Sequence, residues 1–254
     1  MLVRILGAHQ AESRDHRFIS ILIDDHLVID AGGLTSTLTL EEQRRLEAVL
    51  ITHRHFDHIK DLPPLVHNLW ESKSVHVYCI EDVRGMLVEH VFNDLLWPAV
   101  HAVSGDRRPL VFHVVEPGDP FDVLGYRVLA LSMPHTVPVV GYYVERGGKR
   151  LFYTSDTRAT GDPAWANLPL DLLLVETTMC SRDEQRAEQV GHMTPLSLER
   201  ELHAYHARQG YYPRTVCVHI NPGHEDRIRE EIGDLAAKLR ADIRLAHEGM
   251  VIEL

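Results

Sequence analysis

The stretch AVLITHRHFDH, residues 48–58, decides how the rest of the chain is interpreted, because an apolar run ends there in three imidazoles and a carboxylate. The apolar part is typical of a buried strand. In extended backbone, His53 and His55 project to the same side, so both imidazoles can bind one cation. Asp57 and His58 follow after the chain turns and can bind a second cation beside the first. The stretch therefore predicts a site for two metal ions.

The H-x-H-x-D-H pattern at a strand end resembles the signature of the metallo-β-lactamase superfamily of binuclear metallohydrolases. The resemblance implies three further ligands, each at a strand end: a histidine, an acidic residue that bridges the metals, and a last histidine. His135, Asp156 and His219 match them in this order, and each follows or ends an apolar run. The alternative is a chance surface cluster in a chain with 18 histidines, but chance does not predict downstream ligands.

The resemblance also implies how the ligands divide between the metals. The first metal would take His53, His55 and His135, the second Asp57, His58 and His219, and Asp156 would bridge the two. Imidazoles and carboxylates without thiolates suit zinc, manganese or iron. We expect two divalent ions, zinc first, with Mn²⁺ or Fe²⁺ as alternatives. Between metals roughly 3.5–4 Å apart, a shared water loses a proton near neutral pH and becomes a nucleophile, so the expected reaction is hydrolysis.

The hydrophobic pattern indicates an α/β protein. Short apolar runs predict strands at residues 2–6, 18–23, 27–29, 49–52, 75–80, 111–115, 127–131, 141–144, 150–154, 172–175 and 215–218, with two more at the end. Helices are expected at residues 39–46, 58–70, 81–92, 196–209 and 225–239. The first should begin with a capping box of Thr39 and Glu42. The resembled family implies an αββα sandwich of two mixed β-sheets flanked by helices, and no linker divides residues 1–254, so we expect a single domain.

The bulk properties limit the partners. The formal net charge of −11 argues against nucleic acid, because phosphate-backbone binding depends on clustered Lys and Arg. A small phosphodiester is still compatible with this charge, since metals supply positive charge locally. Cys79, Cys180 and Cys217 have no C-x-x-C spacing, which favours a reducing compartment over disulfides. No signal-peptide pattern or bilayer-spanning stretch is present, so we expect a soluble, cytoplasmic protein, with a homodimer left open.

Two departures from sister branches narrow the class. Lactamases of this superfamily commonly have Cys where Asp156 stands. The di-iron, oxygen-reducing branch has Glu where His55 stands. Neither lactam hydrolysis nor redox chemistry is favoured.

Other segments resemble the class II cyclic-nucleotide phosphodiesterases. They are HVFNDLLWP (90–98), SDT (155–157), VET (175–177), GHMTP (191–195), HINP (219–222) and EG (248–249). Two departures are Asn221, where the family has Lys, and GAHQ (7–10), where the family start is Gly-rich. The resemblance implies that a metal-bridging hydroxide opens the phosphate ring of cAMP or cGMP to a 5′-nucleotide, with Asp57 in the catalytic set.

Candidate roles for other residues follow from the same resemblance. His192 would contact the phosphate or protonate the leaving oxygen, and Glu176 would orient it; the alternative for His192 is packing at a helix start. Phe92 and Trp97, with Asn93 between them, would bind the base, although core packing explains the aromatic rings nearly as well. Asp30 would orient a ligand ring from behind, or serve a turn with the glycines that follow it.

Three other functions compete with this one. A nuclease resembling ribonuclease Z shares the ligands, Glu176 and the GH motif at 191–192. That enzyme carries a long arm for tRNA between the His135 and Asp156 positions, where only 20 residues intervene here. A catalytically silent nucleotide-binding domain would usually have lost ligands, and all seven are present. A hydrolase of another small phosphodiester, ester or lactone also fits.

Overall fold

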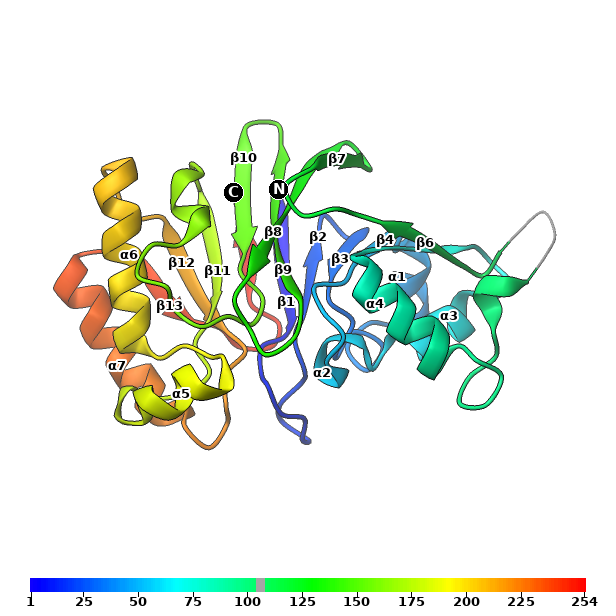
Figure 1. Cartoon of the computed structure of the whole chain (residues 1–254), viewed down its shortest axis with the longest axis horizontal. Coiled ribbons are helices and arrows are strands. Elements are labelled where there is room, and N and C mark those ends of the chain that lie inside the picture. Colours follow the sequence, from blue (N-terminus) through cyan, green and yellow to red (C-terminus); the bar gives the residue numbers. More distant parts are fainter. Residues whose placement is uncertain (104–107) are drawn as a thin grey trace.

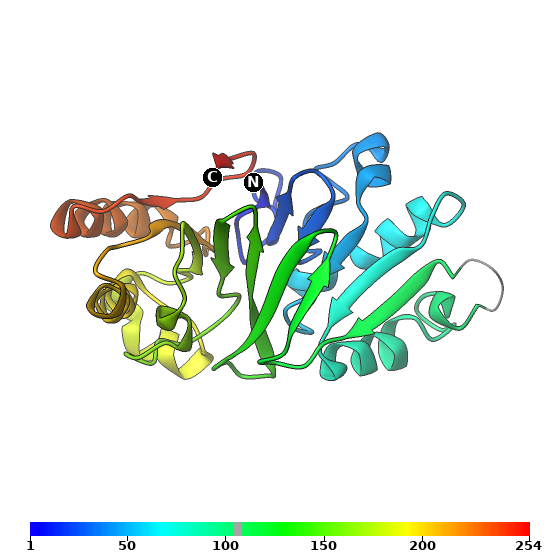
Figure 2. The same cartoon turned by 90° about the horizontal axis from the view of Figure 1, so that it is seen from above.

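Two β-sheets of seven strands each form the centre of the computed structural model, which describes residues 1–103 and 108–254. The sheets pack against each other, and helices cover their outer faces (Figures 1 and 2). The larger apolar cluster draws on both halves of the chain, from Val3 to Ile252. This arrangement confirms the predicted αββα sandwich.

The first sheet has the order β14-β1-β2-β3-β4-β5-β6. Its strands are β1 (Leu2–Gly7), β2 (Ser20–Ile23), β3 (Leu27–Ile29), β4 (Ala48–Leu50), β5 (Val75–Cys79), β6 (Leu110–Val114) and β14 (Val251–Glu253). Pairing is antiparallel from β14 to β3 and parallel from β3 to β6. The central strands β2, β3 and β4 are buried at every position, which explains why they appear in the sequence as unbroken apolar runs.

The second sheet repeats this plan in the order β13-β12-β11-β10-β9-β8-β7. Its strands are β7 (Pro120–Val123), β8 (Tyr126–Met133), β9 (Val139–Arg146), β10 (Lys149–Tyr153), β11 (Leu172–Glu176), β12 (Arg214–Val218) and β13 (Ile243–Leu245). Pairing is antiparallel from β7 to β10 and parallel from β10 to β13. Strands β8, β10, β11 and β12 therefore run in one direction and end at one edge of the sheet.

The helices lie outside the two sheets. They are α1 (Leu40–Arg45), α2 (Phe56–Ile59), α3 (Leu62–Leu69), α4 (Glu81–Met86), α5 (Glu184–Val190), α6 (Pro195–Gln209) and α7 (Glu225–Leu239). In Figure 1, α5, α6 and α7 flank the second sheet and α1, α3 and α4 flank the first. The Thr39–Glu42 capping box is present at the start of α1, as predicted.

Two predicted helices are divided in the structure. Residues 58–70 form α2 and α3 rather than one helix, because Pro63 and Pro64 lack amide hydrogens and fit only the first turn of a new helix. Residues 81–92 form α4 followed by a π-helical turn at Leu87–Val91. The sequence prediction also missed β7 and α5. No helix of the described residues is long and apolar enough to cross a membrane, and the three cysteines are buried and unpaired.

Candidate metal centre

The seven predicted ligands come together at the edge where the strands of the second sheet end. His53, His55, Asp57 and His58 lie on the loop and short helix that follow β4. His135, Asp156 and His219 follow the ends of β8, β10 and β12. Figure 1 shows β8 and β10 pointing toward the edge at which α2 lies. The carboxyl ends of parallel strands commonly carry functional residues in this way.

The ligands form two groups. His53, His55, His135 and Asp156 bring one ligand atom each within 4.8 Å of the others; the three histidines are called the first ligand group below. Asp57, His58 and His219 do the same and are called the second ligand group. The structure thus brings the seven predicted ligands together in two groups, and the assignment of one ion to each group stays a prediction.

Asp156 lies between the groups, with one oxygen facing each. Its Oδ2 is 3.7 Å from Nε2 of His53 and 3.9 Å from Nε2 of His135. Its Oδ1 is 3.4 Å from Nε2 of His58 and 3.3 Å from Nε2 of His219. This is the arrangement that a bridging carboxylate requires.

The donor atoms fit cations better than they fit one another. Nε2 of His53, Nε2 of His58 and Oδ1 of Asp156 are buried and lack a hydrogen-bond partner among the described residues. A buried polar atom without a partner costs free energy, so such atoms are rare unless an ion or a water satisfies them. Three converging in one place indicate that the residues present fit a pair of divalent cations.

Most of the predicted ligand imidazoles form a hydrogen bond through Nδ1, which leaves Nε2 free to bind a metal. His58 contacts Oδ2 of Asp30 at 2.7 Å, and His135 contacts the carbonyl of Gly191 at 2.8 Å. His219 contacts the hydroxyl of Thr178 at 2.9 Å. The carboxylate of Asp30 therefore contacts the ring of a predicted ligand, His58.

Two hydroxyl groups behind the ligands were missed by the sequence prediction. Thr178 donates its hydroxyl hydrogen within a buried network and lies 2.7 Å from Oε2 of Glu176 as well as beside His219. Ser155 donates to Thr52, which in turn lies 3.1 Å from Nδ1 of His53. The general signal was available, because a ligand histidine needs a partner at its second nitrogen, but the sequence does not show which hydroxyl folds next to it.

Three residues that hold or supply ligands have positive φ without being glycine. The φ angles are 60° at Asp30, 56° at Ser155 and 58° at His219. The left-handed region is unfavourable for L-residues, and such conformations gather at functional sites where the surroundings enforce them. The backbone at these strand ends is therefore bent to aim side chains at the centre.

The electrostatics favour a mixture of neutral imidazoles and ionised carboxylates. Burial lowers the pKa of His53 well below its usual range, and the neighbouring His58 lowers it further. Burial and His135 lower the pKa of His55. Burial disfavours charge on Asp156, yet His219 and His58 hold the pKa of its carboxyl well below the ordinary value. Ionised carboxylates and neutral imidazoles are the forms that bind metals.

His58 has the opposite tendency. Burial opposes its charge, but Asp156, Asp30 and Asp57 together raise its pKa well above the ordinary value. The second ligand group thus favours a positive charge at this position. A divalent cation would replace that proton, because binding releases protons from its ligands.

His192 and Glu176 form a pair next to the two groups. Nδ1 of His192 donates to Oε1 of the fully buried Glu176 at 2.9 Å. A ligand atom of His192 lies within 4.8 Å of those of Asp156 and His219, and its ring stacks on His219 with centroids 5.4 Å apart. Burial opposes charge on His192, but Glu176 above all raises its pKa to about 9. The ring is thus oriented toward the centre and able to hold a proton.

The residues predicted to bind the base have other contacts in the structure. Phe92 is fully buried in the larger apolar cluster, so its ring has no exposed face. Trp97 packs against that cluster, with its ring edge-on to His67. The side chain of Asn93 donates a hydrogen bond to the carbonyl of Glu89 and accepts the amides of Leu95 and Leu96. Core packing and loop structure account for these three side chains.

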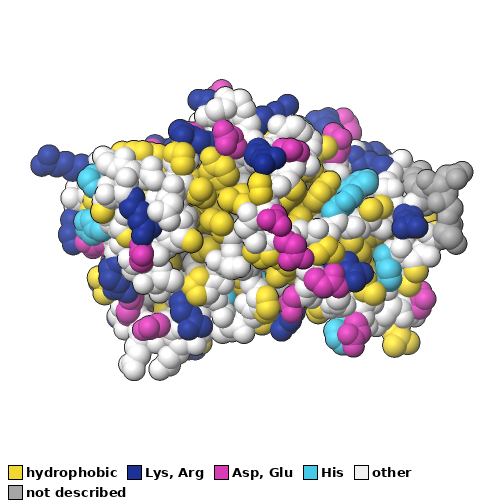
Figure 3. Space-filling view, turned by 45° about the horizontal axis from the view of Figure 1, so that its top comes forward, with side chains coloured by type: hydrophobic (Ala, Val, Ile, Leu, Met, Phe, Trp, Pro, Cys, Tyr) yellow, Lys and Arg dark blue, Asp and Glu magenta, His cyan; other side chains and the backbone are white. Residues whose placement is uncertain are grey.

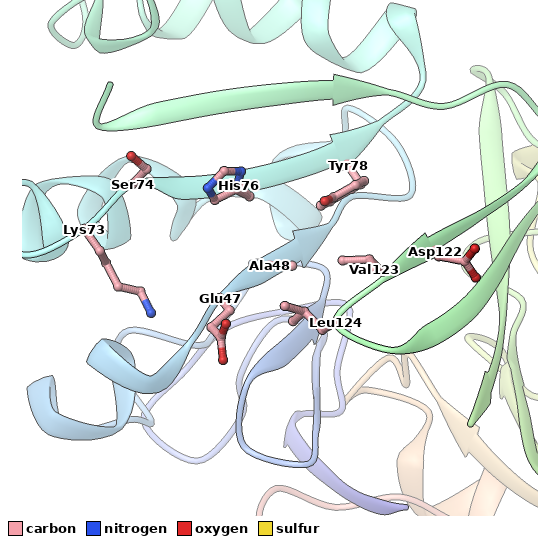
Figure 4. A pocket seen from close by; sticks show the side chains of 9 residues that line it. All are labelled: Glu47, Ala48, Lys73, Ser74, His76, Tyr78, Asp122, Val123 and Leu124. Carbon is pink, nitrogen blue, oxygen red and sulfur yellow. The ribbon is translucent and has the colours of Figure 1, made fainter. Parts of the chain in front are cut away.

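A cavity of about 450 Å³ lies elsewhere, along β4, β5 and the turn between β7 and β8. Its wall includes Lys73, His76, Tyr78 and Asp122 (Figure 4). None of the seven grouped ligands is among the described residues that line it. The candidate site is therefore defined by its donor atoms and not by this cavity.

Comparisons with known proteins identify the family. A family model described as a beta-lactamase superfamily domain matches residues 22–220. Ribonuclease Z of Myxococcus xanthus is 22% identical over 309 residues, covering 98% of this chain and 96% of that protein. 3′,5′-Cyclic-nucleotide phosphodiesterase 1 of Saccharomyces cerevisiae is 27% identical over 198 residues, covering 66% of this chain and 53% of that protein.

A solved structure shows the same architecture. Unliganded yeast PDE1 matches with a TM-score of 0.82 at 18% identity, over 100% of this chain and 99% of that chain. The family match at residues 22–220 spans all seven predicted ligands, from His53 to His219. The chain therefore belongs to the beta-lactamase superfamily and has the metallo-β-lactamase fold.

Proposed function

We propose that this protein is a binuclear metal-dependent phosphodiesterase that hydrolyses 3′,5′-cyclic nucleotides to 5′-nucleotides. The observation that carries the proposal is the position of Asp156, whose two oxygens face two separate groups of ligands. His192 stands beside them with its orientation fixed by Glu176. Superfamily membership supports the coarser statement, a metal-dependent hydrolase.

The chain's own residues define where the cations would be held. The first ligand group would hold one and the second ligand group the other, with Asp156 shared. Two cations in such a site supply Lewis acidity toward phosphoryl oxygens and make a water acidic near neutral pH. Zinc is our first choice, and manganese or iron suits the same donors.

His192 would donate a proton to the leaving group. When the bond to the 3′-oxygen of a cyclic nucleotide breaks, that oxygen needs a proton. With its pKa raised to about 9 by Glu176, His192 would hold one at Nε2, while its Nδ1 hydrogen is donated to Glu176. A charged imidazole there would also contact a phosphoryl oxygen favourably.

The substrate class rests on two kinds of observation. The yeast phosphodiesterase supports a cyclic nucleotide, both by sequence and by fold. In addition, the residues between His135 and Asp156 are largely taken up by β9 and β10, whose hairpin turns at Gly147 and Gly148. We infer a small substrate, because no long arm departs from this part of the chain.

A nuclease is the second candidate, and the ribonuclease Z match over 98% of the chain favours it. That match removes the support for treating nucleic acid as an improbable partner on net charge alone. On the face shown in Figure 3, Lys and Arg side chains are interspersed with Asp and Glu around a band of hydrophobic side chains. This pattern differs from the clustered positive charge of a typical phosphate-backbone surface.

The test is a direct comparison of substrates. Purified, metal-loaded protein is incubated with cyclic AMP, cyclic GMP, bis(p-nitrophenyl) phosphate and a pre-tRNA, with Asp156→Ala as the inactive control. We expect turnover of a cyclic nucleotide to the 5′-product. Turnover of the generic diester without either cyclic nucleotide would refute the specific proposal and leave the class intact. Processing of the pre-tRNA alone would establish the nuclease.

A further inference from the structure

A separate cluster of side chains able to bind a metal lies where the N-terminal loop meets the start of α7. His9, His16 and Glu225 bring one ligand atom each within 4.8 Å of the others. Nε2 of His9 is 3.2 Å, and Nε2 of His16 is 3.7 Å, from Oε2 of Glu225. Ligands of a tetrahedral zinc with bonds of about 2.0–2.1 Å are separated by roughly 3.3–3.5 Å. The spacing therefore suits a cation at the centre of the three atoms.

Both imidazoles are held from behind, as ligand histidines are. Nδ1 of His9 lies 2.6 Å from Oε1 of Glu248, and Nδ1 of His16 lies 2.8 Å from the hydroxyl of Ser13. The same Glu248 oxygen accepts the backbone amide of Arg17 at 2.9 Å. A carboxylate behind a histidine fixes its tautomer and raises its basicity as a ligand.

The hydrogen bond from His9 to Glu248 leaves no hydrogen for the contact on the other side of the His9 ring. Because Glu248 is an acceptor, His9 carries its hydrogen on Nδ1, and the neutral ring then has a lone pair on Nε2. That lone pair faces a carboxylate oxygen of Glu225, which also has only lone pairs. Either a proton or a metal ion must lie between them. Nε2 of His16 faces the same oxygen, and three converging donors favour the metal ion.

The three residues are fixed by the scaffold. His9 is 2% exposed and makes β-bridges to both Phe18 and Ile220. Glu225 occupies the first turn of α7, a helix of fifteen residues. The side chains of His16 and Glu225 are 27% and 20% exposed, so a fourth position is open to water. Ligands on a strand-like segment, a loop and a helix would be tied together by one ion.

We propose that His9, His16 and Glu225 form a site for one divalent cation, of the zinc class, separate from the centre built around Asp156. Two imidazoles and a carboxylate are ligands that zinc accepts. The ion would fasten the N-terminal loop to α7. It would also support the segment around Ile220, which follows the ligand His219 directly in the chain. The site does not depend on the proposed substrate.

The experiment counts metal ions per chain. Full-length protein is stripped with a chelator, reloaded with Zn²⁺, freed of excess metal and analysed by inductively coupled plasma mass spectrometry. We expect His16→Asn and Glu225→Gln each to bind one equivalent fewer than the wild type. His90→Asn, which removes an exposed histidine outside these groups, is the matched control and should keep the wild-type count.

A double variant separates this site from the proposed catalytic centre. Asp156→Ala alone should retain the equivalent held by His9, His16 and Glu225, and Asp156→Ala combined with His16→Asn should lose it. A Zn²⁺ count that is the same in His16→Asn, Glu225→Gln and the wild type would overturn the proposal. Circular dichroism of each variant verifies that a lower count does not come from unfolding.

Discussion

The two halves of the molecule follow the same plan but supply their ligands differently. In the first half, four predicted ligands lie on one short segment after β4. In the second half, His135, Asp156 and His219 come from the ends of three separate strands. A local segment carries its ligand spacing with it, whereas the second set exists only when β8, β10 and β12 pair in register. The second half therefore determines whether the two groups are joined.

The halves also differ in how they hold a ligand ring. The first half uses the buried carboxylate of Asp30 behind His58, and the same carboxylate accepts the amide and hydroxyl of Thr52. The second half uses the neutral hydroxyl of Thr178 behind His219. A charged hydrogen bond is stronger than a neutral one. The first half should therefore contribute more to the affinity for the shared cation.

The largest effect is expected from Asp156→Ala, which breaks the link between the halves. Metal ions contribute several kcal/mol of transition-state stabilisation, and each 1.36 kcal/mol is tenfold in rate. We expect turnover of the best substrate to fall by about a thousandfold or more, with loss of one bound ion. Steady-state kinetics and metal analysis measure both.

The control for this substitution is Asp122→Ala, on the exposed side of β7, which should leave both quantities unchanged. If Asp156→Ala kept two ions at the centre, the role of Asp156 between the two groups would be wrong.

The next largest effect is expected at Asp30 and Thr178, which both contact histidines of the second ligand group. Loss of such a partner typically costs 10–100-fold in metal affinity. We expect Asp30→Asn to weaken binding by about 100-fold and Thr178→Val by about 10-fold. Competition against a coloured chelator measures both affinities. Equal losses of metal affinity, or a larger loss in Thr178→Val, would contradict the expectation that a charged hydrogen-bond partner contributes more than a neutral one.

A smaller effect is expected at the positioning residue Glu176. Glu176→Gln keeps the shape but weakens the bond to His192, so kcat should fall by roughly 10- to 100-fold, as for removal of acid–base assistance. KM should change less than kcat, because the substrate would still be bound by the cations. A change confined to KM would show that the pair serves binding instead.

The smallest effects are expected at two helix caps, one in each half. Thr39 caps α1 and is exposed, whereas Thr194 caps α6 and is fully buried. Thr→Ala at a cap costs about 0.5–2 kcal/mol, and we expect the buried cap to lie at the upper end because its unpaired backbone amide would be shielded from water. We expect a loss of about 0.5–1 kcal/mol for Thr39→Ala and about 2 kcal/mol for Thr194→Ala. Urea unfolding followed by circular dichroism compares them, and equal losses would show that burial of the cap is irrelevant.

The sequence predicted the local features well because they depend on neighbouring residues. The spacing of His53 and His55 places them on one side of an extended segment, and the Thr39 capping box needs only the residue three positions on. The strand ends before His135, Asp156 and His219 were also recognisable as apolar runs. Superfamily resemblance then supplied the order of the ligands, which composition alone does not give.

The features that failed depend on distant parts of the chain. Thr178 and Ser155 are ordinary hydroxyl residues until the sheet brings them beside His219 and Thr52. Phe92 was grouped with substrate contacts, yet its fully buried ring belongs to the larger apolar cluster. His9 and Glu225 are 216 positions apart, and only the fold brings them together. Side-chain partners across such distances cannot be deduced from a local pattern.

The pairing of β1 with β14 has a consequence for engineering. The amide of Leu254 bonds to the carbonyl of Met1 at 3.0 Å, so the two ends of the chain lie side by side. A short peptide could join them, and the exposed tip at Gly147 and Gly148 could be opened to create new ends. Such a circular permutant would place His135 near one end and Asp156 near the other. Its metal content would reveal whether sheet pairing alone, without continuous connection through that hairpin, assembles the ligands.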